Sequence, residues 1–226
     1  MASRSDIIIC AHNEQKTIGP VLEAVGKSDY VNNVIVVADG CTDDTASVAL
    51  NYTSTVLPTH FVNKGSAMAY GLGHVRTPYV GFCDADISGL TSDHVDELLA
   101  KECSGQTAGL FEWNTFFSGL PPITGQRCVP TWVAENATLF NSGWEAEHRI
   151  NTVVARYGLP WKHFTLVGVK HPSKIEEGQL AGWAKEMSKV GSYSVRHLPD
   201  LVKYVGFPEG RRLYHAPSNG RLNMKA

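Results

Sequence analysis

The chain contains 226 residues, of which 43% are hydrophobic and 19% are charged, and its formal net charge is −2. This composition is that of an ordinary globular protein, with enough residues for one large α/β domain or two small ones. The near-neutral charge gives no general argument for binding nucleic acid or an anionic membrane surface. We find no apolar run of about 18 residues that would span a bilayer and no apolar signal-peptide core near Met1. The five cysteines lack paired spacing, which is typical of free thiols. We therefore expect a cytoplasmic protein without a transmembrane segment.

Strand-like and helix-like segments alternate from residue 6 to about residue 102. Short apolar runs predict strands at 6–11, 34–38, 53–57 and 79–84. Helical spacing of apolar residues predicts helices at 17–25, from about Asp43, through 67–72 and at 92–101. Right-handed βαβ crossovers would follow from this alternation, so we expect an α/β fold with a mostly parallel central sheet and helices on both faces.

The rhythm of the sequence changes after residue 105, although no repeat or linker divides the chain. We expect strands at 107–113 and 164–169 and helices at 145–157 and 175–190, whereas 114–130 has no clear period. The tail from Arg211 contains four basic residues and no acidic one. We interpret this tail as solvated or disordered rather than as a contact for an anionic partner. The simplest domain assignment is one domain over 1–226.

Polar clusters follow three of the predicted strands, at 12–14, 39–44 and 84–86. Because ligands of parallel α/β sheets sit beyond the carboxyl ends of the strands, these loops should line one crevice. In a continued strand, Asp84 and Asp86 would point to the same face. Two carboxylates that close together favour a divalent cation such as Mg²⁺ or Mn²⁺, which commonly carries substrate phosphates. A solvated turn that happens to contain two aspartates is the alternative interpretation.

Four motifs in the first half resemble those of family 2 glycosyltransferases. They are the strand and Asn-Glu loop of 6–24, Val36-Val37-Ala38-Asp39-Gly40-Cys41-Thr42-Asp43-Asp44-Thr45, Asn63-Lys64-Gly65 and Asp84-Ala85-Asp86. Their order over about 6–90 is specific, although each motif is weak by itself. The resemblance implies a single GT-A domain of Rossmann-like type. Within it we expect a nucleotide-sugar half at about 5–105, an acceptor half at about 106–200 and a basic tail at 208–226.

Shorter segments of the second half carry looser resemblances. Thr124-Gly125-Gln126-Arg127 resembles an acceptor-side Gly-x-Arg element, and Gly143-Trp144-Glu145-Ala146-Glu147 with Asn151 resembles a Gly-aromatic-x-x-Glu segment. Val169-Lys170-His171 is similar to the strand-end histidine of glucosyl-3-phosphoglycerate synthases, where this residue helps to ligate the metal.

The resemblance implies transfer of a sugar from a nucleotide-sugar donor, most simply a UDP-sugar, to an acceptor hydroxyl with Mn²⁺ or Mg²⁺. A bound cation stabilises the negative charge that develops on the diphosphate leaving group. We expect Asp86 to ligate the metal directly, Asp84 to bind the ribose or a metal-bound water, and His171 to complete the site. Imidazole fits Mn²⁺ better than Mg²⁺. For His171, a capped strand end before Pro172 is an equal alternative.

The donor nucleotide would be bound by residues from all four motifs. Asp39 would accept a hydrogen bond from the N3–H of uracil, or else cap the helix near Asp43. Lys64 would contact the nucleotide as a point charge. The alternative is an exposed lysine without a ligand, but a positive charge near the start of a helix is unfavourable, which favours the binding role. The full predicted set is Ala11, Asn13, Glu14, Asp39, Lys64, Asp84 and Ala85. Glu14 has an alternative place in the first turn of the following helix.

The acceptor side rests on three candidate catalytic residues. Arg127 would hold an acceptor phosphate or the donor diphosphate. Glu145 or Glu147 would be the general base of an inverting reaction. Residues two apart do not share a helix face, so at most one should point into the site, and Glu147 is the better motif match. Ala38 replaces the first Asp of the family's Asp-Asp-Gly, and no Glu-Asp pair is present, so inverting and retaining outcomes both stay open.

Two other classes of protein fit parts of this pattern. A nucleotidyltransferase has a similar sheet, but the loop after its first strand usually has a Gly-rich basic signature, where this chain has His12-Asn13-Glu14. A non-catalytic nucleotide-binding or scaffold protein is the second alternative. The acceptor itself is not indicated: a small molecule, a polysaccharide or a nucleic acid, including a hydroxymethylated base in phage DNA, all remain open, and so does the oligomeric state.

Overall fold

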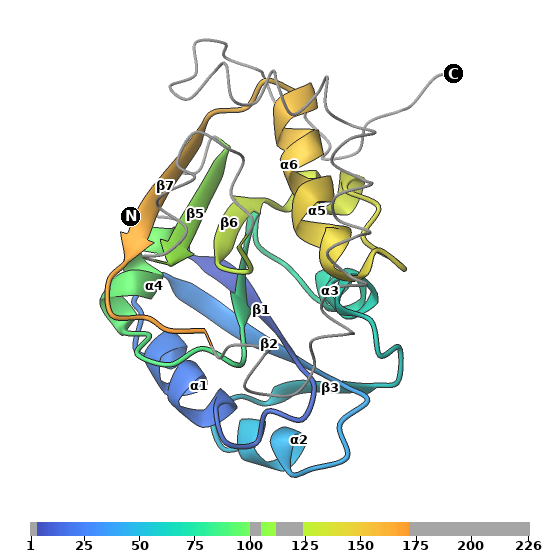
Figure 1. The fold of residues 1–226 in the computed structure, drawn as a ribbon, viewed down its shortest axis with the longest axis vertical. Helices are drawn as coiled ribbons and strands as arrows, with labels where there is room; N and C mark the ends of the chain where they lie inside the picture. The colour runs from blue at the N-terminus through green and yellow to red at the C-terminus, as the bar shows by residue number, and fades with distance from the viewer. Residues whose placement is uncertain (1–3, 100–104, 112–123, 172–226) are drawn as a thin grey trace.

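The computed structural model describes residues 4–99, 105–111 and 124–171 (Figure 1). Its strands form one sheet in the order β3-β2-β1-β4-β6-β5-β7. The strands are β1 (Ser5–Ala11), β2 (Val31–Asp39), β3 (Thr55–Thr59), β4 (Tyr79–Asp84), β5 (Gln106–Phe111), β6 (Arg127–Pro130) and β7 (Trp161–Leu166). The helices are α1 (Ile18–Gly26), α2 (Thr45–Ala49), α3 (Lys64–Leu72), α4 (Ser92–Leu99), α5 (Thr131–Asn136), the 3₁₀ turn η2 (Gly143–Glu145) and α6 (Ala146–Arg156).

Strand direction divides this sheet into a parallel part and one reversed strand. β1 pairs in parallel with β2 and β4, β2 with β3, and β5 with β7. Among the described strands, β6 runs antiparallel to both of its neighbours, β4 and β5. The expected mostly parallel sheet is therefore confirmed.

The central strand β1 shows why the sheet is covered on both faces. Ile7, Ile8 and Ile9 are all at most 1% exposed. Successive side chains of a strand point to opposite faces. Ile8 accordingly packs with the apolar sides of α3, α5 and α6, whereas Ile7 and Ile9 pack with those of α1 and α4. The continuous apolar run thus produces a three-layer α/β/α arrangement, as expected.

The second half of the chain departs from the sequence-based expectation in two places. The strand expected at 164–169 is β7, which spans Trp161–Leu166, because Gly168 adopts a φ of +78° and turns the chain after Val167. β6 and α5 were not predicted. β6 has only four residues, all buried, so it shows no alternation that could identify it. The expected helix at 175–190 and the basic tail lie outside the described residues.

The parallel arrangement brings the carboxyl ends of β1, β2 and β4 to one edge of the sheet. The polar loops that follow these strands therefore lie side by side, as the sequence predicts. Across the described residues, the structure contains no helix that is both long and apolar enough to cross a membrane.

Candidate active site

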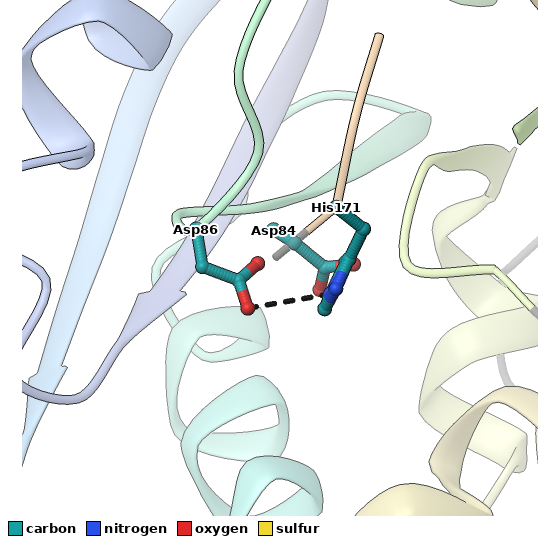
Figure 2. Close-up of side chains that lie close together, drawn as sticks. All are labelled: Asp84, Asp86 and His171. Atoms are coloured by element: carbon teal, nitrogen blue, oxygen red, sulfur yellow. Dashed lines mark ion pairs between the residues drawn. The ribbon is translucent and has the colours of Figure 1, made fainter. Parts of the chain in front are cut away.

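Asp84, Asp86 and His171 converge beyond the end of β4 (Figure 2). Each offers a ligand atom, and these atoms all lie within 4.8 Å of one another. Nε2 of His171 lies 3.2 Å from Oδ2 of Asp86. Asp84 is the last residue of β4 and Asp86 stands in the turn that follows, so the two carboxylates meet through a turn rather than a continued strand. The expected proximity of these three residues is confirmed.

A short backbone bridge carries His171 to this position. The N–H of Ser88 donates to the carbonyl of Lys170, the N–H of Lys170 donates back to Ser88, and both distances are 2.9 Å. The two segments approach so closely that a Cβ on Gly89, which has a φ of +79°, would collide with the carbonyl oxygen of Gly168. Glycine is therefore required at residue 89 both for its left-handed backbone and for space.

Lys64 connects Asp84 with the second half of the chain. It begins α3, and its Nζ lies 2.8 Å from Oδ1 of Asp84 and 2.8 Å from Oε1 of Glu147. Burial by itself would lower the pKa of Lys64, but the two carboxylates outweigh burial and raise that pKa above its ordinary value. Lys64 is thus a firmly charged cation at the base of the site, in agreement with the expected point charge.

Two residues that sequence reasoning did not assign hold the other side of the Asp84 carboxylate. Nε2 of Gln126 donates to Oδ2 of Asp84 at 3.0 Å, and Oγ1 of Thr124 donates to Oε1 of Gln126 at 2.7 Å. Gly125 lies so close that a Cβ there would overlap the carboxylate. Burial raises the pKa of Asp84, but Lys64, His171 and Gln126 together hold that pKa below its usual value. The carboxylate is therefore ionised and fixed in orientation.

Asp39 ends β2 and is 5% exposed. Its Oδ1 accepts hydrogen bonds from Oγ1 of Thr59 (2.9 Å) and the N–H of Phe61 (2.6 Å), and its Oδ2 accepts one from the N–H of Asn63 (2.9 Å). Asp39 therefore anchors the segment 59–63 that leads to Lys64. The alternative expectation, that Asp39 caps α2, is therefore wrong. At the start of α2 the acceptor is Asp43, whose Oδ1 accepts from the N–H of Thr45 at 3.0 Å.

The remaining predicted nucleotide residues lie around the ends of β1 and β4. Asn13 has a φ of 59°, and its Oδ1 accepts from the N–H of Thr42 at 2.7 Å. Glu14 precedes α1, with its carboxylate accepting from Oγ1 of Thr17 at 2.8 Å, so it does not stand in the first helical turn. Ala11 ends β1. Ala85 is 2% exposed and packs in the core on the α1 side of the sheet, so its side chain does not face a ligand.

The structure requires a correction for Arg127. The expected contact with a phosphate needs an exposed guanidinium, but Arg127 is fully buried. Its Nε and Nη2 donate to the carbonyl of Thr124 at 2.9 and 2.6 Å, and its Nη1 donates to Oδ1 of Asn151 at 3.1 Å and to the carbonyl of Glu147 at 3.2 Å. Arg127 therefore ties β6 to α6 within the protein.

The two acidic residues before and within α6 point in different directions. Glu147 reaches Lys64, as described above, whereas Oε2 of Glu145 pairs with Nη2 of Arg149 at 3.2 Å, one helical turn along. Of the two residues, Glu147 is therefore the one that lies beside Lys64, as the sequence favoured. Its role as a general base stays a prediction.

Comparison with known proteins shows which proteins the first half of the chain resembles. Residues 6–102 match the family model described as glycosyl transferase family 2. The chain is related to family 2 glycosyltransferases. Over 99 residues it is 37% identical to the 4,4'-diaponeurosporenoate glycosyltransferases of Staphylococcus aureus strains USA300 and NCTC 8325. That match covers 41% of the chain but only 26% of each relative, so the chain spans about a quarter of their length.

Solved structures share the fold over most of the chain. A crystal structure of glucosyl-3-phosphoglycerate synthase from Mycobacterium tuberculosis with phosphoglyceric acid has a TM-score of 0.66 and 20% identity, and it covers 84% of this chain and 80% of that one. The structure of the same enzyme with Mn²⁺, UDP-glucose and phosphoglyceric acid has a TM-score of 0.65 and 18% identity. This match covers 92% of this chain and 81% of that chain. The expected GT-A fold is confirmed by these similarities.

Proposed function

We propose that the protein is a metal-dependent glycosyltransferase that moves a sugar from a UDP-sugar to an acceptor hydroxyl. The observation that carries this proposal is the convergence of Asp84, Asp86 and His171 beside Lys64, at the ligand-binding edge of a GT-A sheet. The family 2 match covers the segments that supply both aspartates and Lys64. Similar solved structures contain UDP with Mn²⁺ or Mg²⁺, which supports UDP as the donor nucleotide.

The residues around Asp86 fit a divalent cation. Two carboxylates and one imidazole whose ligand atoms lie within 4.8 Å form a donor set of the kind that binds Mn²⁺. The imidazole makes this set better suited to Mn²⁺ than to Mg²⁺, which prefers oxygen ligands. When bound, the cation would neutralise the negative charge that develops on the leaving diphosphate.

The protein's own groups would prepare the site for that charge. Lys64 holds Asp84 in place and adds a fixed positive charge near the proposed diphosphate position. Gln126 fixes the other oxygen of Asp84, so the carboxylate does not have to reorient when a donor binds. Asp39, at the end of β2, holds the segment 59–63 by hydrogen bonds. Asp39 and Asn13, which stands in the loop after β1, would line the proposed site for the base.

The alternatives differ from this proposal in measurable ways. A nucleotidyltransferase would form a nucleotide–sugar bond from a nucleoside triphosphate, and a scaffold protein would bind a nucleotide without turnover. The comparisons give no support to a hydroxymethylated DNA base as the acceptor. The acceptor half proposed at about 106–200 remains to be matched with a substrate, for which phosphorylated small molecules, polysaccharides and lipids are the classes to screen.

Donor hydrolysis tests the proposal without knowledge of the acceptor. UDP release from a panel of UDP-sugars would be measured with Mn²⁺ for the wild type, Asp86→Asn and Asp29→Asn, the last changing an exposed aspartate between α1 and β2. We expect slow UDP release by the wild type and by Asp29→Asn, and loss of release by Asp86→Asn. Equal release by all three proteins, or product formation from UTP and a sugar phosphate instead, would contradict the proposal.

A further inference from the structure

Asn63 stands where the two halves of the described chain meet. Its Oδ1 accepts a hydrogen bond from the N–H of Ser66 at 2.9 Å, which caps the N-terminus of α3. The same oxygen accepts a second hydrogen bond from the N–H of Gly143 at 3.2 Å. One amide oxygen therefore satisfies a helix start in the first half and the start of η2 in the second half.

The neighbours of Asn63 strengthen this junction. Oγ of Ser66 accepts from the N–H of Asn141 at 3.0 Å. At Gly65, a Cβ would overlap Oγ of Ser142 and the carbonyl of Leu139, so the backbone of α3 lies directly against the segment 138–143. Residues 63–66 thus hold this segment by hydrogen bonds and by close packing.

The 138–143 segment has a backbone that needs such support. Thr138, Asn141 and Gly143 have φ values of 52°, 59° and 56°. Left-handed backbone is unfavourable for a β-branched residue such as Thr138, and it persists only where surrounding contacts determine it. The segment runs through η2 into α6, which carries Glu147 in its first turn. Its position therefore sets how far Glu147 lies from Lys64.

We propose that Asn63 is a positioning residue, which locks α6 to α3 and thereby sets Glu147 against the Lys64–Asp84 pair. This inference rests on the proposed glycosyl transfer for its kinetic consequence, but its structural consequence can be measured separately. Asparagine suits this position because its carbonyl oxygen has two lone pairs and accepts two donors from different directions. The side chain touches no reacting atom, so its effect on turnover passes through Glu147 and Lys64.

Two substitutions separate the junction from ordinary helix capping. Serine is a good N-cap and would keep the hydrogen bond to Ser66, but its shorter side chain would not also reach Gly143. Aspartate keeps an acceptor oxygen at the same reach and is favourable at a helix N-terminus. Asn63→Ser should therefore lose the link between the halves, whereas Asn63→Asp should keep both hydrogen bonds.

Hydrogen–deuterium exchange and donor turnover would be measured on the full chain for the wild type, Asn63→Ser and Asn63→Asp. For Asn63→Ser we expect faster exchange in the peptide covering 138–147, unchanged exchange in 67–72, and a fall in kcat of about tenfold or more with KM for the UDP-sugar within about threefold. We expect Asn63→Asp to resemble the wild type in both measurements.

Unchanged exchange in 138–147 for Asn63→Ser would overturn the inference. Faster exchange in both 67–72 and 138–147 would also overturn it, because Asn63 would then act only as a helix cap. If the wild type turns over no UDP-sugar, the proposed function fails, and the exchange result still decides whether Asn63 locks the two helices together.

Discussion

Nζ of Lys64 and Oδ1 of Asp84 lie 2.8 Å apart, and the same ammonium lies 2.8 Å from Glu147. These side chains are partly exposed, at 24% for Lys64, 16% for Asp84 and 10% for Glu147. One cation therefore compensates two largely buried carboxylates that would otherwise repel each other. Lys64 therefore has a structural role in addition to the ligand-binding role proposed for it.

Replacing Lys64 should cost stability. We expect Lys64→Met to lower the free energy of unfolding by about 1–3 kcal/mol at neutral pH, because Asp84 and Glu147 lose their shared partner. Urea unfolding would measure the change. Lys27→Met is the matched control, since Lys27 pairs with Glu23 on the surface of α1 at 65% and 57% side-chain exposure, and such a pair contributes little. Equal effects of the two substitutions would contradict the account.

The stability difference between the wild type and Lys64→Met should depend on pH. The pKa of Asp84 is lowered in the folded protein, so its contribution is present above its unfolded pKa of about 3.9 and is lost as pH falls through the folded pKa. The pKa of Lys64 is raised, so its contribution is complete below its unfolded pKa of about 10.4. The difference should stay level between about pH 5 and pH 10 and shrink in acid. A difference that grows on acidification would refute this assignment.

A methyl group at residue 125 should disturb the Asp84 carboxylate directly. A Cβ at Gly125 would overlap both of its oxygens, so Gly125→Ala should destabilise the fold by about 1–3 kcal/mol and weaken UDP binding. In Gly26→Ala the added Cβ meets no atom within 4 Å, so this control should change stability by less than about 1 kcal/mol. Thermal unfolding and UDP titration of both variants would decide the point.

Removing the Asp39 carboxylate charge should affect the fold as well as the nucleotide. Asp39→Asn replaces an acceptor of three hydrogen bonds by an amide that has one accepting oxygen. We expect a loss of about 1–3 kcal/mol in unfolding free energy together with weaker UDP binding. If UDP binding falls while stability and exchange of 59–63 stay at wild-type values, Asp39 acts on the base alone and the anchoring role described here is wrong.

His171 should determine the preference among cations. In His171→Ala, UDP binding supported by Mn²⁺ should weaken by about tenfold or more, whereas binding supported by Mg²⁺ should change less, because imidazole is a better ligand for Mn²⁺. The control is His163→Ala. His163 is an exposed residue of β7, and the centroid of its ring lies 5.3 Å from that of Trp161, on which it stacks. Loss of the same size with both cations would argue that His171 positions Asp86 rather than a metal.

Several features were predictable because their signals are local. The runs that form β1 and β4 are apolar and short, and the polar residues that follow them meet because parallel strands end at one edge. The motif order then led from Asp84 and Asp86 to the resemblance to family 2 glycosyltransferases and to the GT-A fold. Helix geometry indicated that at most one of Glu145 and Glu147 would enter the site, and the motif match favoured Glu147.

The features that were missed depend on contacts between distant residues. The bridge between Ser88 and Lys170 that brings the predicted His171 to Asp86 was not predicted, because no periodicity marks a bridge of single residues. Arg127 looked like a phosphate ligand in sequence, but β6 places it in the core, where it bonds to Thr124 and Asn151. Gln126 carries no local signal beyond its place in a Gly-x-Arg segment.

Calorimetric titration with UDP is the strongest test for a metal-dependent nucleotide-sugar site in this protein. The wild type would be titrated with UDP, GDP and CDP in Mn²⁺ and again after EDTA, alongside Asp86→Ala at a confirmed unchanged melting temperature. We expect UDP to bind in Mn²⁺, EDTA to abolish the binding, and Asp86→Ala not to bind UDP. A preference for GDP would overturn the assignment of the nucleotide. UDP binding that survives EDTA, or no nucleotide binding under any condition, would contradict a metal-dependent nucleotide-sugar site.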